Sequence, residues 1–128
     1  IVDKRREKAG VSEVMNIIGD VKDRFCILID DIADSAGTLC NAADALKAAG
    51  ASDVVAYITH GVLSGPAIER LEKSRISRVI LTNTLPLAPE KRIAKIEILS
   101  VAKILADALS AVFEDTSVSE LFGGENQS

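Results

Sequence analysis

The fold of this chain is organised around the stretch FCILIDDIADSAGT, residues Phe25 to Thr38. Its first five residues, Phe25 to Ile29, have the length and composition of a strand that is buried on both faces of a sheet. Two carboxylates, Asp30 and Asp31, follow directly, and a loop of small residues then leads to a helix that we expect to begin near Leu39. A strand that turns through such a loop into a helix N-terminus is typical of a ligand site.

The residue types of this stretch suit a sugar phosphate. Carboxylates accept hydrogen bonds from vicinal hydroxyls or face a hydrated Mg²⁺ ion. The main-chain N–H groups of the loop, together with the dipole of the helix that follows, favour a phosphate. On the residues alone an alternative stays open, in which Asp30 and Asp31 only end a strand and Asp34 only begins a turn.

Strands and helices are predicted to alternate along the rest of the chain. This order predicts an α/β fold with a mainly parallel, twisted sheet, flanked by helices and joined by right-handed crossovers. Asp30, His60 and Asn83 each follow a predicted strand, so we expect them to share one rim of the sheet. The further strands are expected at 13–18, 53–59, 78–82 and 96–99, and helices at 39–49, 66–73, 101–112 and, as a single turn, 117–122.

Composition and charge restrict the class of protein. The 128 residues are 48% hydrophobic but only 3% aromatic, so a single core must be built from aliphatic side chains. A net charge of −4 argues against a general nucleic-acid binder. No apolar run approaches the roughly 20 residues of a membrane span, and no signal peptide is visible, so a cytoplasmic protein is expected. Cys26 and Cys40 are expected to be buried thiols, although a disulfide is conceivable.

The acidic stretch resembles the phosphoribosyl-diphosphate-binding signature of type I phosphoribosyltransferases: a hydrophobic strand, two acids, two spacers and then Asp-Thr-Gly-Gly-Thr or a close variant. Further segments resemble the C-terminal part of the ribose-phosphate pyrophosphokinase family, a homologous group. They are DKRR at Asp3 to Arg6, EVMNIIG at Glu13 to Gly19, THGVLSGPA at Thr59 to Ala67, TNTLP at Thr82 to Pro86 and SVSELF at Ser117 to Phe122.

The resemblance runs over nearly the whole chain. It implies one phosphoribosyltransferase-like (Rossmann-like) domain over residues 1–122, which lacks its own beginning and a preceding domain of the same architecture. The tail, residues 123–128, is expected to be disordered. A fragment of this kind is expected to be inactive by itself.

The resemblance also implies roles for the acidic stretch. Asp30 and Asp31 would hold the ribose 2- and 3-hydroxyls of ribose 5-phosphate. The loop of Asp34, Ser35, Ala36, Gly37 and Thr38 would wrap the 5-phosphate. Ser35 stands for the family's usual threonine and keeps its hydroxyl, whereas Ala36 stands for glycine and is harmless only if its φ is negative.

Catalysis would fall to the segment KRREKAG, residues 4–10, expected to be a mobile loop. The residues alone predict only a solvated basic surface loop. The resemblance, however, implies that Lys4 and Arg6 are catalytic. They would stabilise charge while the β,γ-diphosphoryl group of ATP passes to the anomeric hydroxyl of ribose 5-phosphate, with Mg²⁺ as cofactor. Ser117, Ser119 and Phe122 would belong to an allosteric phosphate or ADP site between subunits of a homohexamer.

Two other classes remain as alternatives. A non-catalytic, synthetase-associated regulatory subunit shares the fold but loses parts of the acidic loop, whereas Asp30, Asp31, Asp34, Gly37 and Thr38 are all present here. A type I phosphoribosyltransferase shares the acidic loop, but it should lack the KRR and SVSELF segments together. The partners expected are therefore ATP, ribose 5-phosphate and further copies of the chain, with no nucleic acid and no membrane.

Overall fold

A computed structural model describes residues 1–5, 14–115 and 118–123 of the chain. In chain order the elements are β1 (Val2–Arg5), β2 (Val14–Ile17), β3 (Phe25–Ala33), α1 (Gly37–Ala48), β4 (Asp53–Gly61), α2 (Ala67–Lys73), β5 (Arg78–Thr82), the 3-10 helix η1 (Pro89–Lys91), β6 (Ile96–Leu99), α3 (Ala102–Phe113) and the 3-10 helix η2 (Val118–Phe122).

Four strands form a parallel sheet in the order β3-β4-β5-β6, which confirms the predicted α/β fold. β1 and β2 pair separately as an antiparallel ribbon, with Lys4 opposite Met15. The basic segment therefore begins inside a strand rather than as a loop at Lys4. Residues 6–13, which hold the rest of it, lie outside the described residues.

The core lies between one face of the sheet and two helices. α1 and α2 cover the side that carries Val54, Ala56 and Ile58, and α1 adds Ala43 and Leu46 to the same cluster. The strand order explains this arrangement. When each right-handed crossover moves one strand further in the same direction, all the crossover helices lie on the same face.

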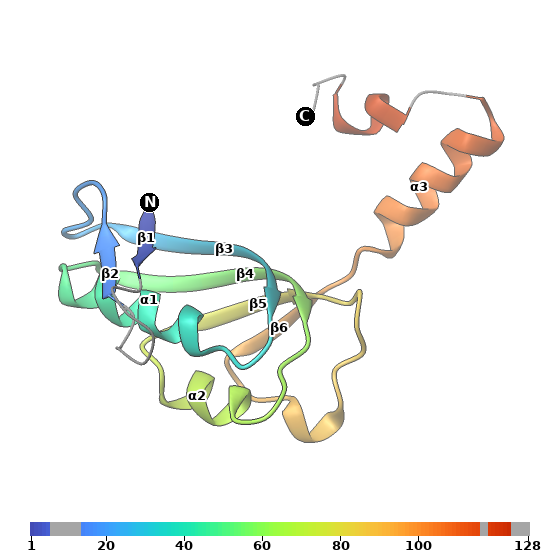
Figure 1. Cartoon of the computed structure of the whole chain (residues 1–128). Helices are drawn as coiled ribbons and strands as arrows, with labels where there is room; N and C mark the ends of the chain where they lie inside the picture. Colours follow the sequence, from blue (N-terminus) through green and yellow to red (C-terminus); the bar gives the residue numbers. More distant parts are fainter. Residues whose placement is uncertain (6–13, 116–117, 124–128) are drawn as a thin grey trace.

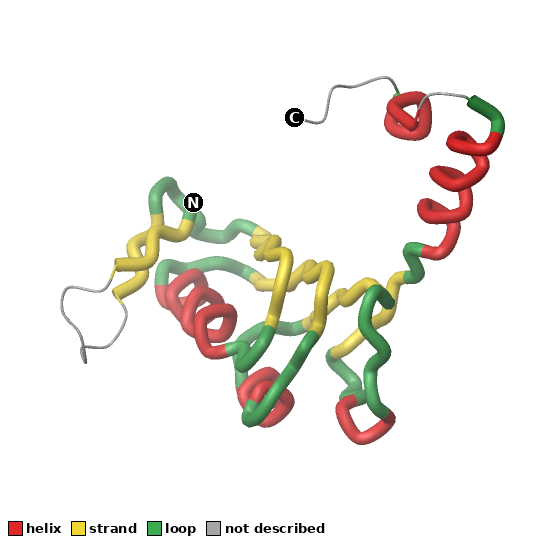
Figure 2. Tube along the Cα trace, turned by 45° about the vertical axis from the view of Figure 1, so that its right-hand side comes forward, coloured by secondary structure: helices red, strands yellow, loops and turns green. Residues whose placement is uncertain are grey.

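The opposite face of the sheet exposes large apolar side chains within the described part of the chain. We call the exposed apolar residues Phe25, Ile27, Ile29, Tyr57 and Leu99 the bare face. The expectation that β3 is buried on both faces is therefore wrong for this chain: Ile29 is 82% exposed and Phe25 is 59% exposed. α3 does not return to cover these residues, because it leads away from the sheet (Figures 1 and 2), and its own apolar side chains are also exposed.

Two helix ends fit the residue types found there, because glycine commonly follows a helix and serine commonly lies at its start. Gly50 follows α1 with a φ of 98°, the left-handed conformation that ends helices. Ser100 accepts a hydrogen bond from the N–H of Ala102 at the start of α3, although the N-cap position itself belongs to Val101. Both cysteines are free thiols, and Cys40 is buried as expected, whereas Cys26 is half-buried rather than buried.

Candidate functional site

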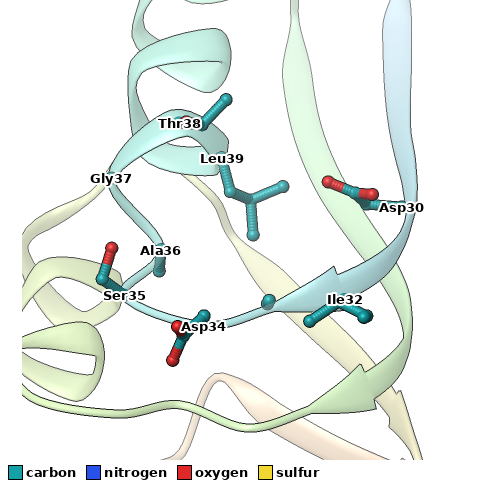
Figure 3. A pocket seen from close by; sticks show the side chains of 9 residues that line it. Asp30, Ile32, Asp34, Ser35, Ala36, Gly37, Thr38 and Leu39 are labelled. Carbon is teal, nitrogen blue, oxygen red and sulfur yellow. The ribbon is translucent and has the colours of Figure 1, made fainter.

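A cavity of about 330 Å³ lies where β3 turns into α1. The described residues that line it all come from the end of β3, the connecting loop and the first turn of α1. They are Asp30, Ile32, Ala33, Asp34, Ser35, Ala36, Gly37, Thr38 and Leu39. The structure thus brings together most of the residues expected to hold a sugar phosphate, and Figure 3 shows Asp30 across the cavity from the loop.

The two acids of β3 are separated by the geometry of the strand. β3 extends to Ala33, so both acids lie inside it, and neighbouring side chains of a strand point to opposite faces. Asp30 lines the cavity, and its Oδ1 accepts a hydrogen bond from the N–H of Asp31 at 2.8 Å. Asp31 is exposed and lies outside the set of residues that line the cavity.

The loop turns into α1 through a left-handed residue. Ala36 is the N-cap of α1, with φ 60° and ψ 11°, and it is only 5% exposed. This is the conformation in which alanine is strained relative to glycine, so the departure from the family pattern at this position carries a conformational cost. Beyond it, the first turn of the 12-residue α1 presents main-chain N–H groups at its positive end, a favourable place for an anion.

The segment between β4 and α2 is bonded to the back of this loop. The N–H groups of Val62 and Leu63 donate to the carbonyl of Ala33, and the N–H of Ser64 donates to the carbonyl of Asp34 at 3.0 Å. The Ser64 hydroxyl also donates to the Asp34 carboxylate. Ser64 is not among the residues expected at the site, because a contact between residues 30 positions apart leaves no local signal in the sequence.

A cation on α2 also supports the loop. Arg70 donates from Nη1 to the carbonyl of Ser35 at 3.0 Å. Its position in the first two turns of a short helix gave no signal in the sequence. Both Ser64 and Arg70 were missed, although Ser64 lies within the segment THGVLSGPA that carries part of the family resemblance.

His60, Thr84 and Asn83 lie at the carboxyl edge of the sheet, as expected. The Nδ1 atom of His60 lies 2.7 Å from Oγ1 of Thr84, within hydrogen-bond distance. His60 is within β4 rather than beyond it. Asn83 accepts from the N–H of Val101 at 2.9 Å and thereby fixes the start of α3.

None of the other expected site residues is among the described residues that line the cavity. The backbone of Lys4 lies in β1, and Arg6 lies outside the described residues. Of the expected allosteric residues, Ser117 lies outside the described residues, while Ser119 and Phe122 belong to η2 beyond α3, far from the cavity (Figure 1).

No metal cluster forms within the described residues, where no three His, Cys, Asp or Glu side chains gather. The carboxylates of Asp30 and Asp31 are nevertheless hard oxygen donors of the kind that suits a hydrated Mg²⁺ ion, which keeps several waters and needs only one or two carboxylates. None of the described helices is long and apolar enough to cross a membrane.

The fold and the cavity together define a class of protein. It is a parallel α/β domain with an acidic strand end and a small-residue loop at a helix N-terminus, a combination suited to a phosphorylated ligand.

Comparison with known proteins gives the family. Residues 5–123 match the family described as the phosphoribosyl synthetase-associated domain, and the chain belongs to this family. It is 56% identical over 125 residues to a ribose-phosphate pyrophosphokinase of Clostridium acetobutylicum, covering 98% of this chain and 39% of that protein. It is 57% identical over 122 residues to the enzyme of the same name from Caldanaerobacter subterraneus subsp. tengcongensis, covering 95% of this chain and 39% of that protein.

A solved structure agrees with these relatives. The crystal structure of phosphoribosylpyrophosphate synthetase from Mycobacterium smegmatis superposes with a TM-score of 0.75 at 45% identity, covering 81% of this chain and 34% of that chain. The chain thus spans about two fifths of the length of the curated relatives that it matches.

Proposed function

We propose that this chain holds the ribose 5-phosphate side of a ribose-phosphate diphosphokinase. The observation that carries the proposal is the cavity in which Asp30 lies opposite the loop 34–38, a carboxylate facing a helix N-terminus. A ribose 5-phosphate presents hydroxyls to the first and a phosphate to the second. The names of the curated relatives support the same substrate.

In the proposed reaction, the anomeric hydroxyl oxygen of ribose 5-phosphate attacks the β-phosphorus of ATP. The bond from that phosphorus to the oxygen bridging the α-phosphorus breaks, AMP leaves, and the hydroxyl proton passes to water. Lys4 and Arg6 would stabilise the charge on the transferring group and on AMP. Asp30 would face a hydrated Mg²⁺ ion bound together with ATP, and this ion would neutralise phosphate charge.

The part of the chain that holds ribose 5-phosphate is Asp30 with the loop. Asp30 would accept from the ribose hydroxyls, and the main-chain N–H groups and hydroxyls of Ser35 and Thr38 would donate to the 5-phosphate. Asp31, on the other face of β3, would act through a water or a metal-bound water rather than by direct contact.

The same proposal covers partners and location. ATP binding, activity and assembly into a homohexamer would require the parts that the full-length relatives have in addition, so the chain alone would not make phosphoribosyl diphosphate. Two free thiols suit a reducing compartment, and we propose the cytoplasm.

Calorimetric titration of the chain with ribose 5-phosphate, in Mg²⁺, tests the proposal. Asp30→Asn should weaken binding about 10- to 100-fold, because hydrogen bonds to a charged acceptor contribute about 1.5–3 kcal/mol. Inorganic phosphate should bind the parent and this variant alike, since it has no sugar hydroxyls. The matched control is Asp44→Asn, an exposed acid on α1 outside the cavity.

Either of two results would overturn the proposal. One is a folded parent that binds neither ribose 5-phosphate nor phosphate, which would favour the regulatory-subunit class. The other is an Asp30→Asn variant that binds ribose 5-phosphate as tightly as the parent does.

A further inference from the structure

Three successive carbonyls, from the last residue of β3 into the loop, accept hydrogen bonds from the segment that follows β4. The carbonyls of Ala33 and Asp34 accept from main-chain N–H groups of residues 62–64, and the carbonyl of Ser35 accepts from Arg70. The first two bonds are made by the backbone and survive most substitutions. The third depends on one side chain, 35 residues away in the sequence.

The orientation of a carbonyl fixes the N–H group of the same peptide unit. In a planar trans peptide the C=O and N–H bonds point in opposite directions. Since the Ser35 carbonyl is held toward α2, the N–H of Ala36 points away from α2. The cavity is lined by β3, the loop and α1, and no residue of α2 is among the described residues that line it.

Gly37 leaves room for the guanidinium of Arg70. A Cβ atom at this position would lie 3.1 Å from Nη1 of Arg70, and the other heavy atom within 4 Å of it is Cζ of the same guanidinium. Gly37 lies in the first turn of α1, and its φ is not in the left-handed region. The close approach of Arg70, rather than the backbone conformation, therefore favours glycine here, because a Cβ atom would displace the guanidinium by a few tenths of an ångström.

We infer that Arg70 is a positioning residue: through the Ser35 carbonyl it fixes the N–H groups of the loop in the direction from which a phosphate binds. The inference rests on the proposed function for the identity of the ligand. It assigns Arg70 no contact with substrate. Lys73 lies one turn further along α2 and forms an ion pair with Glu69. It therefore serves as the control for removing a positive charge from the same helix.

The positioning is measurable without any ligand. In the parent we expect order parameters of about 0.85 for the main-chain N–H groups of residues 35–38, the value of a rigid backbone, and a fall below about 0.7 in Arg70→Met. Lys73→Met removes the same charge from the same helix and should leave these values unchanged. Unchanged order parameters in Arg70→Met would overturn the inference.

The second measurement separates positioning from a direct effect of the charge. Titrated with inorganic phosphate and with ribose 5-phosphate, Arg70→Met should bind both about tenfold more weakly, and Lys73→Met within twofold of the parent. Gly37→Ala keeps the charge of Arg70 but displaces its guanidinium. This variant should therefore also lower the affinity for both ligands. In the double variant that carries both Arg70→Met and Gly37→Ala, the loss of affinity should be smaller than the sum of the two separate losses, because both changes break the same contact.

The outcomes distinguish the two claims. Full affinity in Gly37→Ala, with loss in Arg70→Met, would show a charge effect and overturn the positioning role. A parent that binds neither ligand would overturn the proposed function, and the order parameters would then still decide whether Arg70 positions the loop.

Discussion

The ammonium of Lys95 donates to the carbonyl of Leu71 at 2.9 Å, and it makes bonds of the same length to the carbonyls of Glu72 and Ser74. The last carbonyls of a helix have no partner within the helix, and a cation is favoured at that end. Lys95, which directly precedes the edge strand β6, therefore caps the C-terminal end of α2 and stabilises the helix that carries Arg70.

Replacing Lys95 by methionine should lower the free energy of unfolding by about 1.5–3 kcal/mol, because three carbonyls lose a charged donor. Urea unfolding measures the change. Lys103→Met is the control: Lys103 is exposed on α3 and pairs only with Asp107 at i+4, so its loss should cost less than about 0.5 kcal/mol. Equal small losses in both variants would mean that the three bonds to Lys95 are absent in solution.

The left-handed conformation of Ala36 predicts opposite effects of glycine at two alanines of the same region. Ala36→Gly should raise the free energy of unfolding by about 0.5–1 kcal/mol, because it relieves the unfavourable positive φ. Ala45→Gly, inside α1, should lower it by about the same amount, because glycine is a poor helix former. A loss of stability in both variants would show that position 36 is not left-handed in solution.

Much of the fold was predictable because its signals are local. The strands 78–82 and 96–99 have the predicted bounds, since aliphatic runs this short between polar turns favour a strand over a helix by their length. The acidic stretch was found for a similar reason: strand, acids, loop and helix start lie within 14 consecutive residues. The cavity at this place follows from that order.

The rest depended on contacts distant in the sequence. The Ser64 and Arg70 bonds to the loop and the Lys95 cap of α2 each join residues more than 20 positions apart, and no sequence pattern predicts them.

The exposure of the bare face was not predicted, for another reason. An all-apolar strand such as Phe25 to Ile29 indicates a sheet covered on both sides, but in this chain both crossover helices lie on one side.

The bare face predicts a large difference between two isoleucines on neighbouring strands. Ile58 on β4 is 2% exposed and faces the helices, so Ile58→Ala should cost about 2–5 kcal/mol of stability. Ile29 on β3 belongs to the bare face, so Ile29→Ala should cost about 1 kcal/mol or less, mainly through lost strand propensity. A similar, large cost at both positions would show that the bare face is covered in solution.

Cys40 gives the chain a dependence of stability on alkaline pH. Burial raises the pKa of the Cys40 thiol above its ordinary value; the hydrogen bond with Ser74 acts in the opposite direction, and the carboxylate of Asp44 adds to the rise. The unfolded chain therefore loses this proton first as the pH rises. Stability is unaffected below the unfolded pKa of about 8.5, and it falls as the pH rises from there through the folded pKa.

Urea unfolding between pH 7.5 and 9.5 measures this loss against two variants. One proton contributes at most about 1.4 kcal/mol per pH unit, so the slope of stability against pH should be shallower in Cys40→Ala by up to that amount. Cys26→Ala, which removes the half-buried thiol of β3, is the control for thiol loss. If Cys40→Ala and the parent lose stability in parallel across this range, the buried thiol is not the group that titrates.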